Sequence, residues 1–165
     1  KVREGQCKMI LSDYTIRYCI DHGHIEISDF DDKCLQKDSY VFHLDDKLWF
    51  YKDAVIDPYK PNDDTMMGCF TIPPEGFVVV PGAFYLGRTK EHLKCEKCVP
   101  VASETPKMAF CGVSTIGSQH LMVKGHDEPI SLQIRCAQPV RLYPGMDICI
   151  VRFHTTSSMS LVEEE

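Results

Sequence analysis

The chain has 165 residues, of which 44% are hydrophobic and 25% are charged, and its net charge is −6. This length and composition predict one globular domain with a sizeable core. The negative charge argues against nucleic acid or an anionic membrane surface as a partner, and no apolar run approaches the ~18 residues of a membrane-spanning helix.

The nine cysteines are an odd and high number for a chain of this length. A secreted disulfide framework usually has an even count in a shorter chain, so reduced thiols are expected. We therefore predict an intracellular, reducing location, cytoplasmic or nuclear, or association with a virion. So many free cysteines are more typical of eukaryotic or viral chains than of bacterial ones.

The first predicted element is a short helix. Ser12 and Asp13 provide an N-terminal cap, Ile16, Cys19 and Ile20 recur at helical spacing, and Gly23 follows the last apolar residue.

The rest of the chain reads as short β-rich runs separated by Pro and Gly turns. The expected strands are 35–44, 48–55, 69–72, 77–80, 84–89, 108–111, 130–134, 140–142 and 147–153. The stretch 95–107 is expected to be a connection. This spacing predicts an all-β barrel or sandwich, with one domain over residues 1–153 and an acidic tail over residues 154–165.

Four stretches together point to one family. They are ILSDYTIRYCIDHGHIEISDFD from Ile10, PGAFYLGRTKE from Pro81, GVSTIGSQHLMVK from Gly112 and LYPGMDICIVRF from Leu142. In this order they resemble the dCTP deaminase and dUTPase superfamily. The resemblance implies a mainly β, distorted barrel of the jelly-roll type with one or two short helices. It also implies a homotrimer whose sites lie across subunit boundaries.

The resemblance implies a nucleotide site whose phosphate-binding loop is altered. The family's Gly-Arg-Ser-Ser loop matches a segment in which Val113 replaces the arginine and Ser114 and Thr115 keep the two hydroxyls. The position of a second family arginine is Ser118. An arginine fork makes two charge-assisted bonds to phosphate, so its loss weakens binding by a few kcal/mol, to order of magnitude. The implied nucleotide-binding residues are Ser114, Thr115, Gly117 and Ser118.

The catalytic glutamate of the deaminases is also replaced, since Gln133 stands at its position. A glutamine side chain cannot take a proton from water near neutral pH, so general-base deamination is expected to fail. The family's pyrimidine-reading hairpin is shortened before Ile130. Asp127 or Glu128 is the candidate for a replacement acid.

A metal site is a further hypothesis, because Cys95 and Cys98 have the CxxC spacing of zinc ligands. Cys111, His92 and His126 are the candidates for completing such a site. A redox pair and ordinary loop cysteines are the alternatives. Mg²⁺ enters only together with a nucleotide triphosphate, and no other cofactor is predicted.

Two functional interpretations follow. In the first, the chain is a catalytically degenerate family member that either binds a deoxynucleotide without turning it over or serves as a structural or protein-interaction module. In the alternative, it is an active dCTP deaminase or dUTP diphosphatase with a rearranged site built from Ser114, Thr115 and Asp127 or Glu128.

Overall fold

The structure is a computed structural model that describes residues 10–52, 56–57, 59, 67–115 and 125–155. Its elements, in chain order, are α1 (Asp13–Asp21), β1 (Ile25–Ile27), η1 (Asp32–Cys34), β2 (Tyr40–His43), β3 (Lys47–Tyr51), β4 (Met67–Thr71), β5 (Phe77–Val79), β6 (Tyr85–Cys95), β7 (Val99–Glu104), α2 (Pro106–Phe110), β8 (Val113–Ser114), β9 (His126–Cys136), β10 (Val140–Leu142) and β11 (Asp147–His154). The predicted mainly β fold with short helices is confirmed. Of the predicted tail at 154–165, His154 is the last residue of β11, and residues 156–165 lie outside the described residues.

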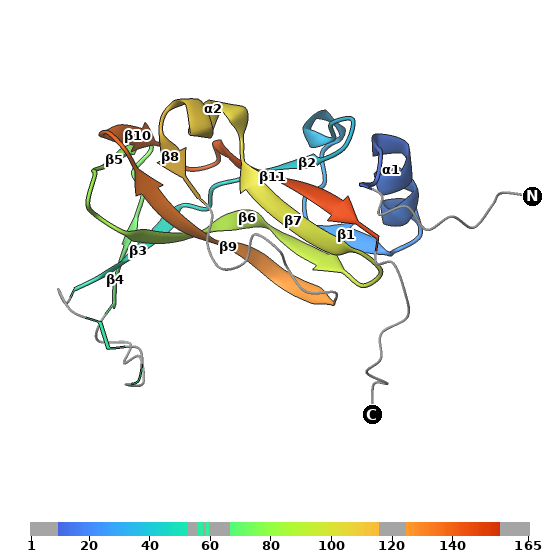
Figure 1. The fold of residues 1–165 in the computed structure, drawn as a ribbon, viewed down its shortest axis with the longest axis horizontal. Coiled ribbons are helices and arrows are strands. Elements are labelled where there is room, and N and C mark those ends of the chain that lie inside the picture. Colours follow the sequence, from blue (N-terminus) through green and yellow to red (C-terminus); the bar gives the residue numbers. More distant parts are fainter. Residues whose placement is uncertain (1–9, 53–55, 58, 60–66, 116–124, 156–165) are drawn as a thin grey trace, which may run out of the picture.

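Among the described residues, the strands form three antiparallel sheets (Figure 1). The largest has the order β4-β3-β6-β9-β8, with β1 added beside β6. A second sheet has the order β2-β11-β7, and β10 pairs with β5 in a third. Strands β6 and β9 share the longest ladder, so they form the spine from which the other elements extend.

The core lies between the large sheet and the β2-β11-β7 sheet. Along β6 and β9 buried and exposed positions alternate, as expected when one face of a sheet packs against a core and the other faces outward. Leu93, Leu132 and Ile134 enter the core from the large sheet, and Phe42 and Phe153 enter it from the opposite sheet. The outward face of the large sheet is therefore free to carry other groups.

Helix α1 begins and ends where the sequence predicts. The Ser12 side chain accepts a hydrogen bond from the Thr15 amide, and Gly23 follows the helix with a φ of 68°. Turn predictions at three further glycines are also confirmed, because Gly76, Gly82 and Gly145 all have positive φ values.

The predicted strand at Met108–Cys111 is wrong. Residues 106–110 form helix α2, which Thr105 caps by accepting a hydrogen bond from the Met108 amide, and Pro106 occupies its first turn. Proline suits this position because an N–H group in the first turn of a helix has no partner within the helix, so the N–H that proline lacks costs no hydrogen bond. The connection expected at 95–107 also contains strand β7.

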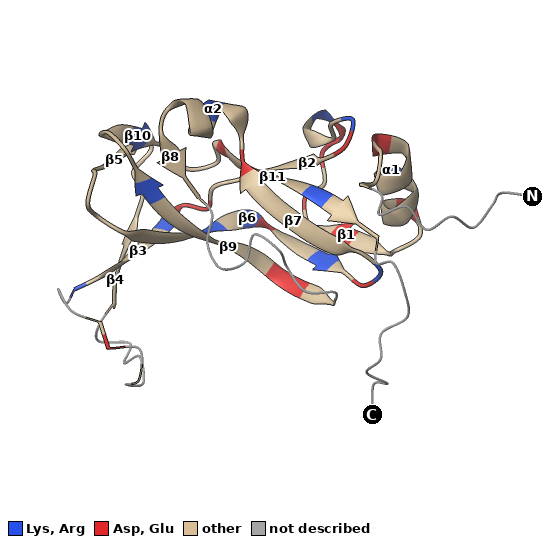
Figure 2. Ribbon diagram, viewed as in Figure 1, with Lys and Arg blue, Asp and Glu red and all other residues tan. Residues whose placement is uncertain are grey.

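Acidic and basic residues are interspersed over the strands and loops (Figure 2). Within the described part of the chain, no helix is long and apolar enough to cross a membrane.

Candidate functional site

The candidate phosphate loop is partly occupied by the chain's own carboxylate. Ser114 donates from its hydroxyl to Glu104 Oε1 at 2.9 Å, and the Thr115 amide donates to the same oxygen at 3.1 Å. Glu104 ends β7 and Ser114 ends β8, and the capped turn of α2 returns the chain so that they meet. Two of the groups that would donate to a phosphate therefore already bind an internal anion.

Val113, which stands at the position of the family's arginine, cannot reach a phosphate by a small movement of the loop. Its side chain is 2% exposed and faces the core, while Ser114 beside it is exposed. Thr115 is also buried. Gly117 and Ser118, the other nucleotide-binding candidates, lie outside the described residues.

Gln133 lies on the outward face of β9, half-buried and opposite Leu86 of β6. Next to it an open hollow of about 530 Å³ is lined by side chains that include Trp49, Leu86, Arg88 and Ser131. The register also pairs Ser114 of β8 with Arg135 of β9, two residues from Gln133. The structure thus brings the hydroxyl loop and the family acid position to the same end of the same sheet.

Asp127 and Glu128 are not part of this group. They lie near the other end of β9, and the six residues from Asp127 to Gln133 span roughly 20 Å of strand. Asp127 Oδ1 is 3.4 Å from the Nε2 atom of His92. Within one chain, the rearranged site that combines these acids with Ser114 and Thr115 is not assembled.

Two arginines on this outward face were missed by the sequence reasoning. Arg88 lies over the ring of Trp49, 5.4 Å from its centroid, and Arg135 lies over Phe84 at 5.0 Å. Such contacts hold a guanidinium by the negative face of the ring. The alternation along β6 and β9 was the signal that could have placed both on the outer face.

The side chains of Cys95 and Cys98 are in contact, with the two Sγ atoms 2.7 Å apart. Among the described residues, no group of three or more His, Cys, Asp or Glu side chains is arranged to hold a metal ion. His126, a candidate further ligand that pairs with Cys95 across the β6–β9 ladder, has its Nε2 atom 2.9 Å from the Glu128 carbonyl oxygen.

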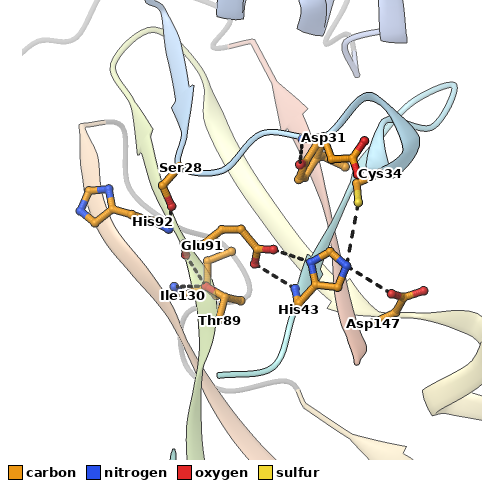
Figure 3. Close-up of polar contacts among 10 residues, drawn as sticks. Ser28, Asp31, Cys34, His43, Thr89, Glu91, His92, Ile130 and Asp147 are labelled. Atoms are coloured by element: carbon orange, nitrogen blue, oxygen red, sulfur yellow. Dashed lines mark hydrogen bonds and ion pairs between the residues drawn. The ribbon is translucent and has the colours of Figure 1, made fainter. Parts of the chain in front are cut away.

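A second polar cluster surrounds Glu91, which is 4% exposed (Figure 3). One Glu91 carboxylate oxygen accepts a hydrogen bond from the His43 amide at 2.9 Å, and the other contacts Nδ1 of the His43 ring. On the opposite edge of that ring, Nε2 lies 3.4 Å from Asp147 Oδ1 and 3.9 Å from Cys34 Sγ. The cluster joins β2, β6 and β11.

This arrangement of thiol, imidazole and carboxylate resembles a nucleophile with its base, but the charges oppose that role. Burial raises the pKa of the Cys34 thiol, and the nearby carboxylates of Asp31, Asp147 and Glu91 raise it further. A thiol nucleophile reacts as the thiolate, which this site disfavours. The cluster is better explained by the fold.

That explanation begins at an irregularity in the β6–β9 ladder, where the register shifts between Arg88 and His92. Here the Thr89 hydroxyl accepts a hydrogen bond from the Ile130 amide at 2.9 Å and donates to the Glu91 carbonyl at 2.8 Å. Side chains thus replace the ladder bonds that the bulge removes. Thr89 and Glu91 of the GRTKE stretch therefore support the sheet.

Comparisons with known proteins agree with this architecture. A family model described as dCTP deaminase-like matches residues 10–156. A dUMP-forming dCTP deaminase from Hathewaya histolytica is 35% identical over 149 residues, 88% of this chain and 83% of that protein. A dCTP deaminase from Rhodopirellula baltica is 33% identical over 152 residues, 92% of this chain and 75% of that protein.

A solved structure shows the same fold. The crystal structure of the 2'-deoxycytidine 5'-triphosphate deaminase from Agrobacterium tumefaciens superposes with a TM-score of 0.71 at 18% identity, over 90% of this chain. The matched region spans 49%, about half, of that longer protein. The family model and the relatives together place the chain: it belongs to the dCTP deaminase-like family.

Proposed function

We propose that this chain is a catalytically degenerate member of its family, whose barrel is retained as a structural or protein-interaction module. The observation that carries the proposal is the Glu104 carboxylate, which accepts hydrogen bonds from the Ser114 hydroxyl and the Thr115 amide. A triphosphate at this loop would have to displace that carboxylate and would be repelled by it. Repulsion between like charges at short range in a partly buried place is strong.

Gln133 supports the same conclusion from the chemical side. Deamination requires a group that takes a proton from the attacking water, and the neutral amide of Gln133 cannot do so near pH 7. Arg88 and Arg135, the two arginines placed on this outer face by the strand register, are cations and cannot serve as the base either.

Exposed aromatic rings support a protein partner. Tyr14 is 80% exposed and Tyr18 is 50% exposed, and they lie one turn apart on α1, where the Tyr18 ring stacks on His22 at 3.9 Å between centroids. Phe110, at the end of α2, is 92% exposed. Aromatic side chains of this kind are enriched in protein interfaces. A homotrimeric assembly and a viral origin, with a place inside the cell or in the virion, complete the proposal.

The experiment compares the wild-type chain with Glu104→Gln in titrations with dCTP and dUTP plus Mg²⁺. The variant keeps an acceptor for Ser114 and removes the negative charge, so its affinity for triphosphate should rise at least tenfold, about 1.4 kcal/mol. Glu96→Gln, which changes an exposed carboxylate far from the loop, is the matched control and should leave affinity unchanged.

The assay also measures ammonia and nucleotide products. We expect none from the wild-type chain or from either variant. Turnover by the wild-type chain that disappears in Asp127→Asn or Glu128→Gln would instead establish the rearranged enzyme and overturn the proposal.

A further inference from the structure

Cys95 and Cys98 stand at the corner where the chain leaves one sheet for another. Cys95 is the last residue of β6 in the large sheet, and Cys98 directly precedes β7, which pairs only with β11 among the described strands. Cys95 is 0% exposed and Cys98 is 4% exposed, so both sulfurs face the interior of this corner.

The distance between the sulfurs distinguishes the chemistries that a CxxC pair can support. Two thiolates on one tetrahedral Zn²⁺, with Zn–S bonds of about 2.3 Å, lie about 3.8 Å apart. The observed 2.7 Å is well below that separation. It lies only about 0.7 Å above the roughly 2.0 Å of a disulfide bond.

The backbone holds Cys95 in place for this contact. Cys95 pairs with Ile25 of β1 on one side and with His126 of β9 on the other. Its carbonyl accepts from the Gly125 amide at 2.8 Å, and the Glu96 amide donates to the His24 carbonyl at 3.3 Å. A bond between the sulfurs therefore needs a small rotation of side chains and no rearrangement of strands.

The two thiols also differ in pKa, as the attacking and resolving thiols of a disulfide-forming reaction do. The hydrogen bond from the Cys98 thiol lowers the pKa of Cys95, although burial works in the opposite direction. The same hydrogen bond, together with burial, raises the pKa of Cys98. This difference favours Cys95 as the attacking thiol and leaves Cys98 as the resolving thiol.

We propose that Cys95 and Cys98 form a redox-active dithiol that closes reversibly to a disulfide, using a small peroxide as the oxidant. The Cys95 thiolate attacks hydrogen peroxide to give a sulfenic acid and hydroxide. The Cys98 sulfur then attacks the sulfenic sulfur, and water leaves as the S–S bond forms. In total, two thiols and one peroxide give one disulfide and two waters, and a dithiol reductant reverses the change. The disulfide covalently links the two sheets at their corner.

A third thiol defines the competing outcome. Cys19 of α1 is half-buried and close enough to Cys95 for their charges to interact, but burial raises its pKa. Cys19 therefore remains protonated.

The test treats the full chain with hydrogen peroxide, quenches it, alkylates the remaining thiols under denaturing conditions and maps the peptides by mass spectrometry. We expect the 95–98 peptide to lose two hydrogen atoms, to resist alkylation and to regain both thiols after dithiothreitol. In Cys98→Ser, Cys95 should instead gain oxygen. Cys19→Ser and the exposed-site variant Cys69→Ser should behave as the wild-type chain does.

Three results would overturn the proposal. In the first, Cys95 and Cys98 remain fully alkylatable after the peroxide has oxidised Cys69. In the second, Cys95 is found linked to Cys19. In the third, the purified chain carries one zinc ion, and removing that ion exposes both thiols.

Discussion

Tyr40 is a buried phenol whose ionisation is coupled to folding. It is 1% exposed, and its hydroxyl accepts a hydrogen bond from the Asp31 amide at 2.9 Å. Burial raises the pKa of Tyr40 to about 12, and the neighbouring Cys34 and Glu91 add to the effect. Because the unfolded value is about 10, the unfolded chain loses this proton first as the pH rises.

The contribution of Tyr40 to the free energy of unfolding should therefore be fully present below about pH 10. Between about pH 10 and about pH 12 the free energy of unfolding should fall by up to about 2–3 kcal/mol. In Tyr40→Phe the lost hydrogen bond lowers stability at pH 8, but this part of the alkaline decline is absent. Urea unfolding over the pH series measures both. Burial also raises the pKa of thiols such as Cys149, and their ionisation affects the wild-type chain and the variant alike. A decline in Tyr40→Phe as large as in the wild-type chain would therefore show that Tyr40 is not its cause.

Glu91 gives a second prediction at this scale. Glu91→Gln replaces one acceptor oxygen by an NH₂ group that faces the donors of His43, so a buried polar group loses its partner. We expect the free energy of unfolding to fall by about 2–3 kcal/mol. Chemical denaturation measures it, with the exposed Glu96→Gln as control, expected within about 0.5 kcal/mol of wild type. Equal effects of the two substitutions would show that the cluster does not support the sheet.

At the level of elements, β3 and β4 meet at a position that only glycine fits. Gly68 is paired with Phe50, and a Cβ atom at Gly68 would overlap the Phe50 ring, which packs at the edge of the core. Gly68→Ala should lower the free energy of unfolding by about 1–3 kcal/mol because the ring must move.

The same substitution in a Phe50→Leu background provides the control. A double-mutant cycle should show that most of the Gly68→Ala cost disappears when the ring is gone. An undiminished cost would mean that the steric contact is not its cause.

The elements also show how far sequence reasoning reaches. Local signals located α1 and the glycine turns because the cap of Ser12 and the positive φ of Gly76 or Gly145 are encoded within a few residues. β7 was missed because Pro100 interrupts its pattern, yet proline is tolerated there since β7 is an edge strand in the described sheet. The misassigned strand at Met108–Cys111 hid α2, although Thr105 and Pro106 are a helix-start signal.

The candidate site was likewise predicted only in part, because some of its contacts are not encoded within a few residues. Ser114, Thr115 and Gln133 were found by resemblance and do lie at one end of the large sheet. Glu104 was not found, because its contact depends on α2 returning the chain to β8. The sulfur contact of Cys95 and Cys98 depends on a corner between two sheets, which spacing alone does not reveal.

For the whole molecule, the central claim is that a dCTP deaminase-like barrel has been kept while its chemistry has been lost. Calorimetry with dCTP and dUTP in the presence of Mg²⁺, with product analysis of the same samples, tests it most directly. We expect at most weak binding heat, and no ammonia, dUTP or dUMP formation, with the wild-type chain. Binding heat accompanied by turnover would contradict it.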